Sequence, residues 1–257
     1  MRPFFRHYGA KYRLSRLLPE PTHKTIIEPF AGSACYSVMH GAGKDVILCD
    51  IDPQTAAIWK WLITASVSDI MALPPTLEEI KDVRLIDAPE PAKWLVQRWL
   101  TPQGKRGNNH APPSCVELSK RPCKRNVFWG KGIRQRIAEQ IPLIRHWRVE
   151  CAEWQSVCGS KATYIFDPPY QLNNGSYDKN TYGKGSIKNV DFDELARVCK
   201  SLDGQVIVHE QQGATWLPFV TLREKAMTGC RKEGKAKMRH EVVWISDSGQ
   251  RQGRLFG

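Results

Sequence analysis

Short apolar runs alternate along this chain with stretches of helical periodicity. The runs 25–28 (TIIE), 45–49 (DVILC), 163–166 (TYIF) and 205–210 (QVIVHE) have the length and the β-branched content of buried strands. HEVVWIS (240–246) predicts a further strand late in the chain. Strands that alternate with helices are typical of a mostly parallel sheet with helices on both faces, so the predicted fold class is α/β.

Two segments between these runs have the i, i+3, i+4, i+7 spacing of an amphipathic helix. The apolar positions are Ile58, Trp61, Leu62 and Ala65 in the first, and Phe192, Leu195, Ala196 and Cys199 in the second. Asp191 and Glu194 form a capping pair that predicts where the second helix begins.

The stretch 62–148 interrupts the alternation. Its periodicity predicts helices at 94–100 and 132–141. The segment between them, 101–132, is rich in Pro, Gly, Asn and cations, and we expect it to form an exposed, hairpin-like arm.

The chain is therefore predicted to hold two units, a sheet domain at 1–61 and 149–257 and an inserted, mainly helical unit at 62–148. Charge adds to this picture, because the chain carries a formal net charge of +12 and the insert holds 15 Lys and Arg against 8 Asp and Glu. An excess of this size favours a nucleic-acid partner. A solvated basic surface is the ordinary alternative.

The composition argues against several other classes of protein. No run of eighteen apolar residues could cross a membrane, and no apolar secretion signal follows Met1, so we expect a cytoplasmic protein without a membrane partner. None of the eight cysteines forms a CxxC pair, which favours buried free thiols. His110, Cys115 and Cys123 lack the usual spacing of zinc ligands, so no metal is expected.

EPFAGSA (28–34) places a carboxylate at the end of a predicted strand, followed by a turn of small residues that enters a helix. At the carboxyl edge of an open α/β sheet, such a turn lets a ligand approach the backbone and a helix N-terminus. Asp50 ends the next strand and suits an acceptor for ribose hydroxyls. Taken singly, a turn of small residues is common in α/β proteins, and Asp50 could be an ordinary carboxylate in the turn after a strand.

DPPY (167–170) is more specific, because its two prolines stiffen the backbone and hold the carbonyl of Pro168 in a fixed direction. That carbonyl and the carboxylate of Asp167 can accept both hydrogens of a planar amino group. They would thereby stabilise the positive charge that develops as the nitrogen attacks a methyl sulfonium. Pro169 sets the backbone of Pro168, and Tyr170 offers a ring on which a flipped base can stack.

In this order, the motifs resemble those of the Dam-like (alpha-group) DNA adenine-N6 methyltransferases. The similarity rests on YGAK (8–11), EPFAGSA, CDID (49–52), a variable basic insert and YIFDPPY (164–170), and it covers nearly the whole chain. It implies a Rossmann-like methyltransferase sheet that binds S-adenosylmethionine. It also implies methyl transfer, without a metal, to N6 of a flipped adenine in duplex DNA, by an orphan enzyme or one paired with a restriction enzyme.

The resemblance implies which residues bind the cofactor. They are Tyr8, Lys11, Glu28, Phe30, Gly32, Ser33, Asp50, Glu153, Trp154 and Asp167. Three departures from the family pattern are Ala10 for a glycine, Ser33-Ala34 in the glycine turn, and Glu153 for an aspartate. Because the first two substitutes are small, we expect weakened or shifted contacts there and not loss of the site.

The insert matches the family's target-recognition domain, a helical unit with a β-hairpin that reads the major groove. Its candidate DNA contacts by residue type are Lys105, Arg106, Lys120, Arg121, Lys124, Arg125, Asn126 and Lys131. Among them, Arg121 and Arg125 suit guanine edges. Lys105, Arg106 and Lys131 suit phosphates.

Three other segments contain candidate functional residues. The long loop 171–190 after DPPY is predicted to be a flap, and the cationic segment 230–240 offers further backbone contacts to DNA. His209 and Glu210 suggest acid–base or metal chemistry, but methyl transfer needs neither. We therefore expect packing or loop-orienting roles for both.

The sequence is also compatible with other functions. The same amino-group chemistry would serve an N4-cytosine methyltransferase, and an RNA adenine methyltransferase would also use these motifs. A non-catalytic DNA-binding protein on a degenerate methyltransferase scaffold is the third alternative.

Overall fold

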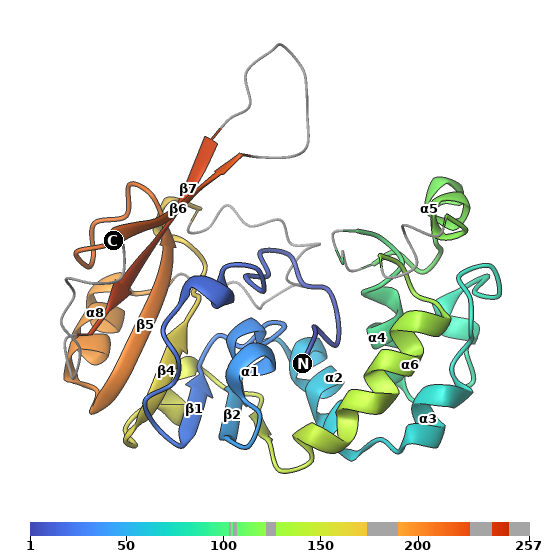
Figure 1. The fold of residues 1–257 in the computed structure, drawn as a ribbon, viewed down its shortest axis with the longest axis horizontal. Helices are drawn as coiled ribbons and strands as arrows, with labels where there is room; N and C mark the ends of the chain where they lie inside the picture. Colours follow the sequence, from blue (N-terminus) through green and yellow to red (C-terminus); the bar gives the residue numbers. More distant parts are fainter. Residues whose placement is uncertain (103, 105–106, 122–126, 174–189, 227–237, 247–257) are drawn as a thin grey trace.

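The computed structural model describes residues 1–102, 104, 107–121, 127–173, 190–226 and 238–246. A seven-stranded sheet lies at its centre, in the order β3-β2-β1-β4-β5-β7-β6 (Figure 1). Five strands run parallel: β1 (Thr25–Glu28), β2 (Asp45–Cys49), β3 (Arg148–Glu150), β4 (Ala162–Phe166) and β5 (Gly204–Gln211). β7 (Met238–Ile245) is antiparallel to both β5 and β6 (Val220–Ala226). The α/β class and the mostly parallel sheet are confirmed.

All five apolar runs are strands in the structure, whereas β3 and β6 were not predicted. These two strands are the edges of the sheet. β3 has only three residues, of which none is buried, and the sequence of β6 (VTLREKA) contains three charged residues. An edge strand lacks the continuous apolar run that identifies a buried strand.

Apolar side chains of the strands point alternately to two cores. Ile26 of β1 belongs to the core that also contains side chains of α1 (Cys35–His40) and α2 (Pro53–Thr64). Its neighbour Ile27 belongs to the other core, with the buried residues of α8 (Phe192–Ser201). Helices therefore cover both faces, as the sequence predicts.

The prediction for α8 is confirmed in detail, and the one for α2 is corrected. Asp191 caps α8, and its buried residues are the four of the predicted stripe. In α2, Trp59 is fully buried while Trp61 is only half-buried, and Ala65 lies just beyond the helix. The stripe is displaced because Trp59 packs against Phe4, Phe5 and Trp147, which come from segments far away in sequence.

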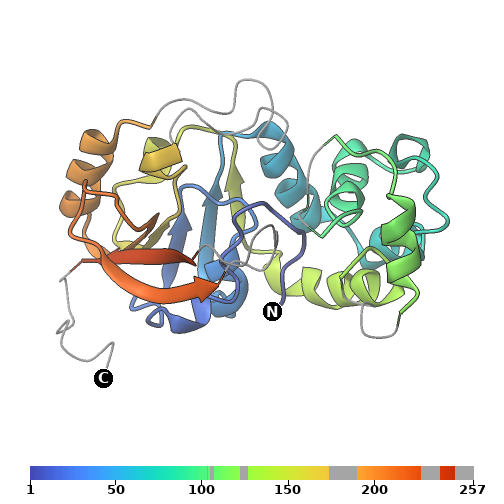
Figure 2. The same ribbon diagram turned by 90° about the horizontal axis from the view of Figure 1, so that it is seen from above.

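Residues 67–144 form the helical region, which lies beside the sheet on the side away from β6 and β7 (Figures 1 and 2). Its helices are α3 (Val67–Ala72), η2 (Val83–Leu85), α4 (Glu90–Gln97), α5 (Pro113–Ser119), α6 (Lys131–Gln140) and η4 (Ile141–Ile144). The boundaries expected at 61/62 and 148/149 fall inside α2 and β3. That 62–148 is a separate domain stays a prediction.

The two helices predicted here are present, but α4 begins at Glu90 and ends at Gln97, whereas α6 (Lys131–Gln140) lies within one residue of its predicted bounds. In the arm 101–132 the structure has a helix that was not predicted, α5, and the described residues of the arm form no hairpin. Both α4 and α5 have prolines where they begin, Pro89 and Pro91 in α4 and Pro112 and Pro113 in α5. A proline is well tolerated in the first turn of a helix, where its missing N–H would have no partner within the helix.

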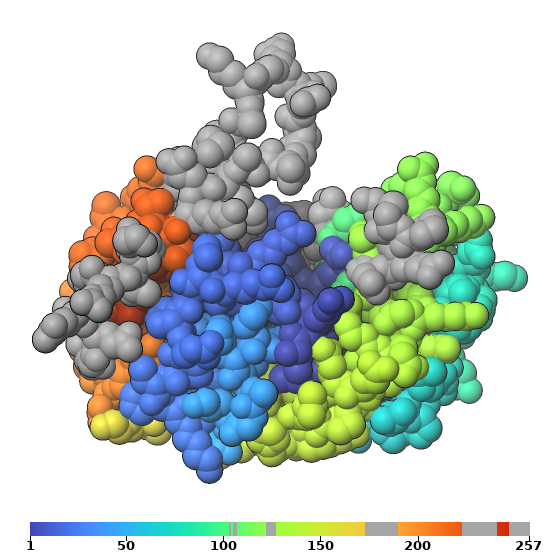
Figure 3. Space-filling model, viewed as in Figure 1, coloured from blue at the N-terminus to red at the C-terminus, as the bar shows by residue number. Residues whose placement is uncertain are grey.

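The N-terminal segment joins the sheet to the helical region. Figure 3 shows it between the blue sheet residues and the yellow-green helical residues. Trp99 donates a hydrogen bond to the carbonyl of Phe4 (3.0 Å), and Arg136 donates one to the carbonyl of Pro3 (2.9 Å). One apolar core contains residues of α2, α4, α6 and this segment, so the sheet and the helical region are packed together.

The remaining elements are the short 3₁₀ helices η1 (Ser15–Leu17), η5 (Trp154–Val157) and η6 (Gln171–Asn173). Six cysteines lie in the described part of the chain and are free thiols. Cys35, Cys49, Cys115 and Cys199 are buried, as expected, Cys158 is half-buried and Cys151 is exposed. Among the described residues, no helix has the length and apolar character needed to span a membrane.

Candidate active site

A pocket of about 660 Å³ lies at the carboxyl ends of β1, β2 and β4. All the residues assigned to cofactor binding and catalysis line it: Tyr8, Lys11, Glu28, Phe30, Gly32, Ser33, Asp50, Glu153, Trp154, Asp167, Pro168, Pro169 and Tyr170. They come together because parallel strands present their carboxyl ends at one edge of the sheet. Their individual roles stay predictions.

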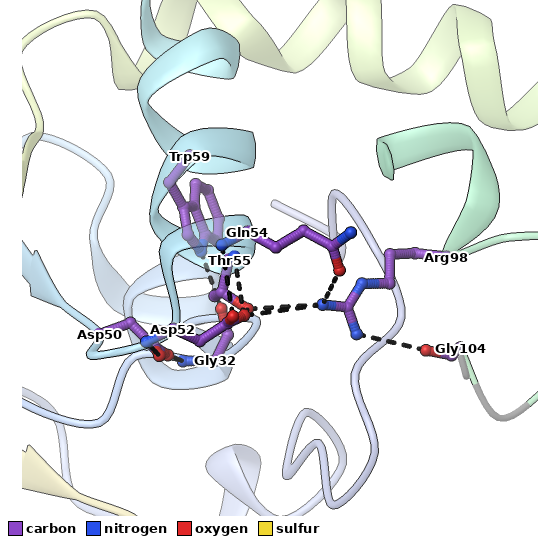
Figure 4. A network of polar contacts seen from close by, with 8 residues as sticks. All are labelled: Gly32, Asp50, Asp52, Gln54, Thr55, Trp59, Arg98 and Gly104. Carbon is purple, nitrogen blue, oxygen red and sulfur yellow. Dashed lines mark hydrogen bonds and ion pairs between the residues drawn. The ribbon is translucent and has the colours of Figure 1, made fainter. Parts of the chain in front are cut away.

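The turn after β1 is held by hydrogen bonds from both sides (Figure 4). The N–H of Gly32 donates to Asp50 Oδ2 (2.8 Å), and the indole N–H of Trp59 donates to the carbonyl of Gly32 (2.8 Å). Gly32 has a φ of 47°, and a Cβ there would lie 3.2 Å from the ring of His7. Both the positive φ and the nearby ring favour glycine at this position.

Asp50 has a structural role that the sequence analysis missed. Its Oδ2 accepts from Gly32, and its Oδ1 accepts the N–H of Asp52 (2.9 Å), so it links the turn to the start of α2. Each carboxylate oxygen has two lone pairs, so the predicted contact with ribose hydroxyls remains compatible with these bonds.

An aromatic wall lines one side of the pocket. The rings of Phe30 and Trp154 are stacked with centroids 6.2 Å apart, and Phe166 packs against both. Phe30 and Trp154 are half-buried, so part of this apolar surface remains accessible. Such a wall suits the flat ring of a nucleoside.

Glu28 lies at the inner end of the pocket, where it is 5% exposed. Its Oε1 accepts the N–H of Ser37 in α1 (2.7 Å). Burial raises the pKa of Glu28 to about 7, an effect that the hydrogen bonds from Ser37 oppose and that the nearby charge of Asp167 adds to. At neutral pH, a cation in the pocket would favour the ionised form.

Asp167, Lys11 and Tyr170 form a cluster beside Glu28. Lys11 Nζ lies 3.5 Å from Asp167 Oδ1 and 4.8 Å from the centroid of the Tyr170 ring. Burial raises the pKa of Asp167, and the charge of Lys11 opposes this rise. The Tyr170 hydroxyl donates to Glu241 Oε2 (2.7 Å), which fixes the ring against β7. Glu241 stands in no motif, so no sequence signal indicated this contact.

Glu210 has the loop-orienting role expected for it. It is fully buried, and its carboxylate accepts hydrogen bonds from the N–H of Gln171 (2.6 Å), the N–H of Gln211 (2.7 Å) and the indole of Trp216 (3.2 Å). The bond to Gln171 fixes the backbone directly after DPPY. His209 is 2% exposed, and burial lowers its pKa to about 3, so its ring is neutral.

The pocket is acidic although the chain is basic. Eight of the residues that line it are Asp or Glu and one is Lys, whereas the whole chain has a net charge of +12. Carboxylates gathered in a cleft create a local potential that favours a cation. The pocket therefore suits a ligand group that carries positive charge.

The structure describes three of the eight candidate DNA contacts. Lys120 pairs with Glu78 (3.0 Å) and Glu117 (3.3 Å), while Arg121 and Lys131 are exposed. The other five, Lys105, Arg106, Lys124, Arg125 and Asn126, lie outside the described residues. So do 174–189 of the predicted flap and 230–237 of the second cationic segment.

The comparisons with known proteins confirm the resemblance stated above. Residues 9–85 match the family model of the D12 class N6 adenine-specific DNA methyltransferases. The match includes EPFAGSA and CDID and ends before DPPY. No curated protein matches the chain. Within the described residues, no three or more His, Cys, Asp or Glu side chains are grouped so that they could hold a metal ion.

The raised pKa of Glu28 predicts how its replacement changes stability. Because this pKa lies above the ordinary value of 4.5, the free energy of unfolding falls as the pH rises from about 4.5 to about 7, where the buried carboxyl group must ionise. Glu28→Gln keeps the acceptor for Ser37 and removes the charge. It should therefore raise the free energy of unfolding at pH 8 by up to about 3 kcal/mol, with little effect at pH 5.

Urea unfolding of both proteins at pH 5 and pH 8 measures this difference. Glu139→Gln is the matched control, because Glu139 is exposed on α6 and should show little change at either pH. If Glu28→Gln changed the free energy of unfolding equally at the two pH values, the raised pKa of Glu28 would be contradicted.

Proposed function

We propose that this protein transfers the methyl group of S-adenosylmethionine to N6 of an adenine flipped out of duplex DNA. The family match supports adenine-N6 methylation of DNA. The observation that carries the finer proposal is that the cofactor turn and DPPY, which are more than 130 residues apart, line one acidic pocket.

The residues of the pocket fit this cofactor. Glu28 and Asp167 supply negative charge near the place where its cationic groups would lie, and Lys11 supplies a positive charge for its carboxylate. Asp50 offers lone pairs to ribose hydroxyls, and the wall of Phe30 and Trp154 offers apolar surface to the purine. The pocket volume of about 660 Å³ is within the usual range for sites of small ligands.

Bound S-adenosylmethionine supplies a methyl group on a cationic sulfur that departs as a neutral thioether. The protein's part is to hold the adenine amino group. The Asp167 carboxylate and the Pro168 carbonyl accept its two hydrogens, so its lone pair faces the methyl carbon and the charge that develops on nitrogen is stabilised. Asp167 then takes the extra proton from the methylated nitrogen. Its raised pKa makes it a stronger base than an ordinary aspartate.

Tyr170 would stack on the flipped base. Its hydroxyl is held by the hydrogen bond to Glu241, and Lys11 Nζ lies over one face of its ring. An aromatic ring held in place in this way offers a stacking surface without further loss of side-chain entropy.

The helical region would read the DNA. α5 lies on the side of the molecule toward which the carboxyl end of β1 points (Figure 1). Arg121 is exposed and lies two residues after the end of α5. Duplex DNA that contacts this region would thus pass over the edge of the sheet where the pocket lies.

Removal of Asp167 tests the proposed chemistry. Asp167→Ala should abolish transfer of labelled methyl from S-adenosylmethionine to duplex DNA, while S-adenosylhomocysteine binding remains within a few-fold of that of the wild type. Asp203→Ala is the control, because Asp203 is exposed at the opposite, amino end of β5. Digestion of the product should yield N6-methyladenine, and near-normal turnover by Asp167→Ala would refute the catalytic role.

The alternatives give different products in the same assay. Exclusive N4-methylcytosine would indicate the cytosine enzyme, and preferential methylation of structured RNA over duplex DNA would indicate the RNA enzyme. Failure of S-adenosylmethionine to raise the melting temperature would favour the non-catalytic DNA-binding protein.

The salt dependence of DNA binding tests the DNA surface. Arg121→Ala with Arg125→Ala should weaken binding to duplex DNA and reduce the slope of log K against log salt, because the variant brings two fewer cations close to the DNA. Lys24→Ala is the control, because Lys24 is exposed at the amino end of β1, opposite the pocket. An unchanged slope in the double variant would place the DNA on another surface.

A further inference from the structure

A buried arginine connects the helical region to the sheet. Arg98 caps the carboxyl end of α4 and is only 1% exposed. Its NH1 donates to the carbonyl of Gly104 (3.4 Å), on the side of the helical region. Its NH2 faces α2, where it donates to Gln54 Oε1 (3.3 Å) and Thr55 Oγ1 (3.5 Å).

The same guanidinium group reaches the residue that caps α2. Arg98 NH2 lies 4.0 Å from Asp52 Oδ2, and the Asp52 carboxylate accepts from the N–H groups of Gln54 and Thr55. The N–H of Asp52 in turn donates to Asp50 Oδ1. Figure 4 shows the continuous series of contacts from Gly104 through Arg98 and Asp52 to Asp50 and Gly32 in the turn of the pocket.

The segment after Arg98 also contacts the N-terminal segment, at residues that directly precede those lining the pocket. Arg6 donates to the carbonyl of Pro102 (2.6 Å), and Trp99 donates to the carbonyl of Phe4. A Cβ on Gly104 would lie 2.6 Å from Arg6 Cβ, so the two backbones are in close contact. The residues that directly follow Arg6 line the pocket, as does Asp52. Residues 98–102 and 104 therefore contact Asp52 on one side of the pocket and the chain directly before His7 on another.

Stability alone is a poor explanation for Arg98. Taking a guanidinium group out of water costs free energy that an apolar side chain of similar size would not cost. The group recovers part of this cost through hydrogen bonds that join two different parts of the fold. In some proteins, buried ionic groups of this kind fix one relative arrangement of the parts that they join.

We propose that Arg98 is a positioning residue that couples the helical region to the cofactor turn. A ligand that orders the turn would order residues 98–102 and 104 through Asp50, Asp52 and Arg98. By reciprocity, a partner that orders the helical region would tighten binding in the pocket. Lys105 and Arg106, two of the candidate DNA contacts, directly follow Gly104 in the sequence. This inference rests on the proposed function in naming the cofactor as the ligand of the pocket.

Hydrogen exchange of the full wild-type chain, with and without saturating S-adenosylhomocysteine, tests the coupling. The ligand should slow amide exchange at the turn, residues 30–34, and also at 98–101, although none of the latter lines the pocket. Protection confined to the pocket would overturn the coupling and leave the proposed function intact. Absence of binding would overturn the proposed function, and this inference with it.

Two substitutions separate coupling from general stability. Arg98→Met should abolish the ligand-dependent protection at 98–101 and weaken S-adenosylhomocysteine binding by about 2- to 30-fold, the range found for mutations in coupled networks. Arg134→Met is the matched control, because Arg134 also donates to backbone carbonyls, those of Met71 and Leu73, but entirely within the helical region. It should leave both the protection and the affinity unchanged.

Gln54→Ala serves if Arg98→Met does not fold. It removes one acceptor of the Arg98 guanidinium on α2 and should reduce the protection at 98–101 partly. Protection equal to that of the wild type in Arg98→Met, or in Gln54→Ala if Arg98→Met does not fold, would overturn the role of Arg98.

Discussion

The carboxylate of Asp50 is the interaction on which the arrangement of the pocket depends. One oxygen accepts the N–H of Gly32 in the turn after β1, and the other accepts the N–H of Asp52 at the start of α2. Two neighbouring parallel strands are thus joined at their carboxyl ends by one side chain. The glycine turn, the N-terminus of α2 and, through Arg98, the helical region all take their positions relative to this carboxylate.

The distribution of charge separates two kinds of ligand. Cations dominate the chain as a whole, which favours a polyanion at the surface, whereas carboxylates dominate the pocket. A small cation and a nucleic acid can therefore bind to the same molecule without competing for the same charges. Glu28 adds a further property, because a carboxyl group with a pKa of about 7 adjusts its charge to the charge of the ligand.

Most of the candidate site could be predicted from the sequence, because parallel strands bring their carboxyl ends together and the motifs stand at those ends. What could not be predicted depends on contacts between distant segments. Trp59 replaces Trp61 in the core because the N-terminal segment packs on α2, and the edge strands β3 and β6 lack an apolar run. Glu241 and Arg98 stand in no motif, and only the fold shows that they meet Tyr170 and Asp52.

Calorimetry of S-adenosylmethionine binding at pH 7, in two buffers of different ionisation enthalpy, tests the central claim most directly. The claim is that an acidic pocket with a partly protonated Glu28 receives a cationic cofactor. Ionisation of Glu28 on binding should release up to about half a proton per molecule bound, and Glu28→Gln should abolish that contribution. Absence of binding, or binding by the wild type without proton release, would contradict it.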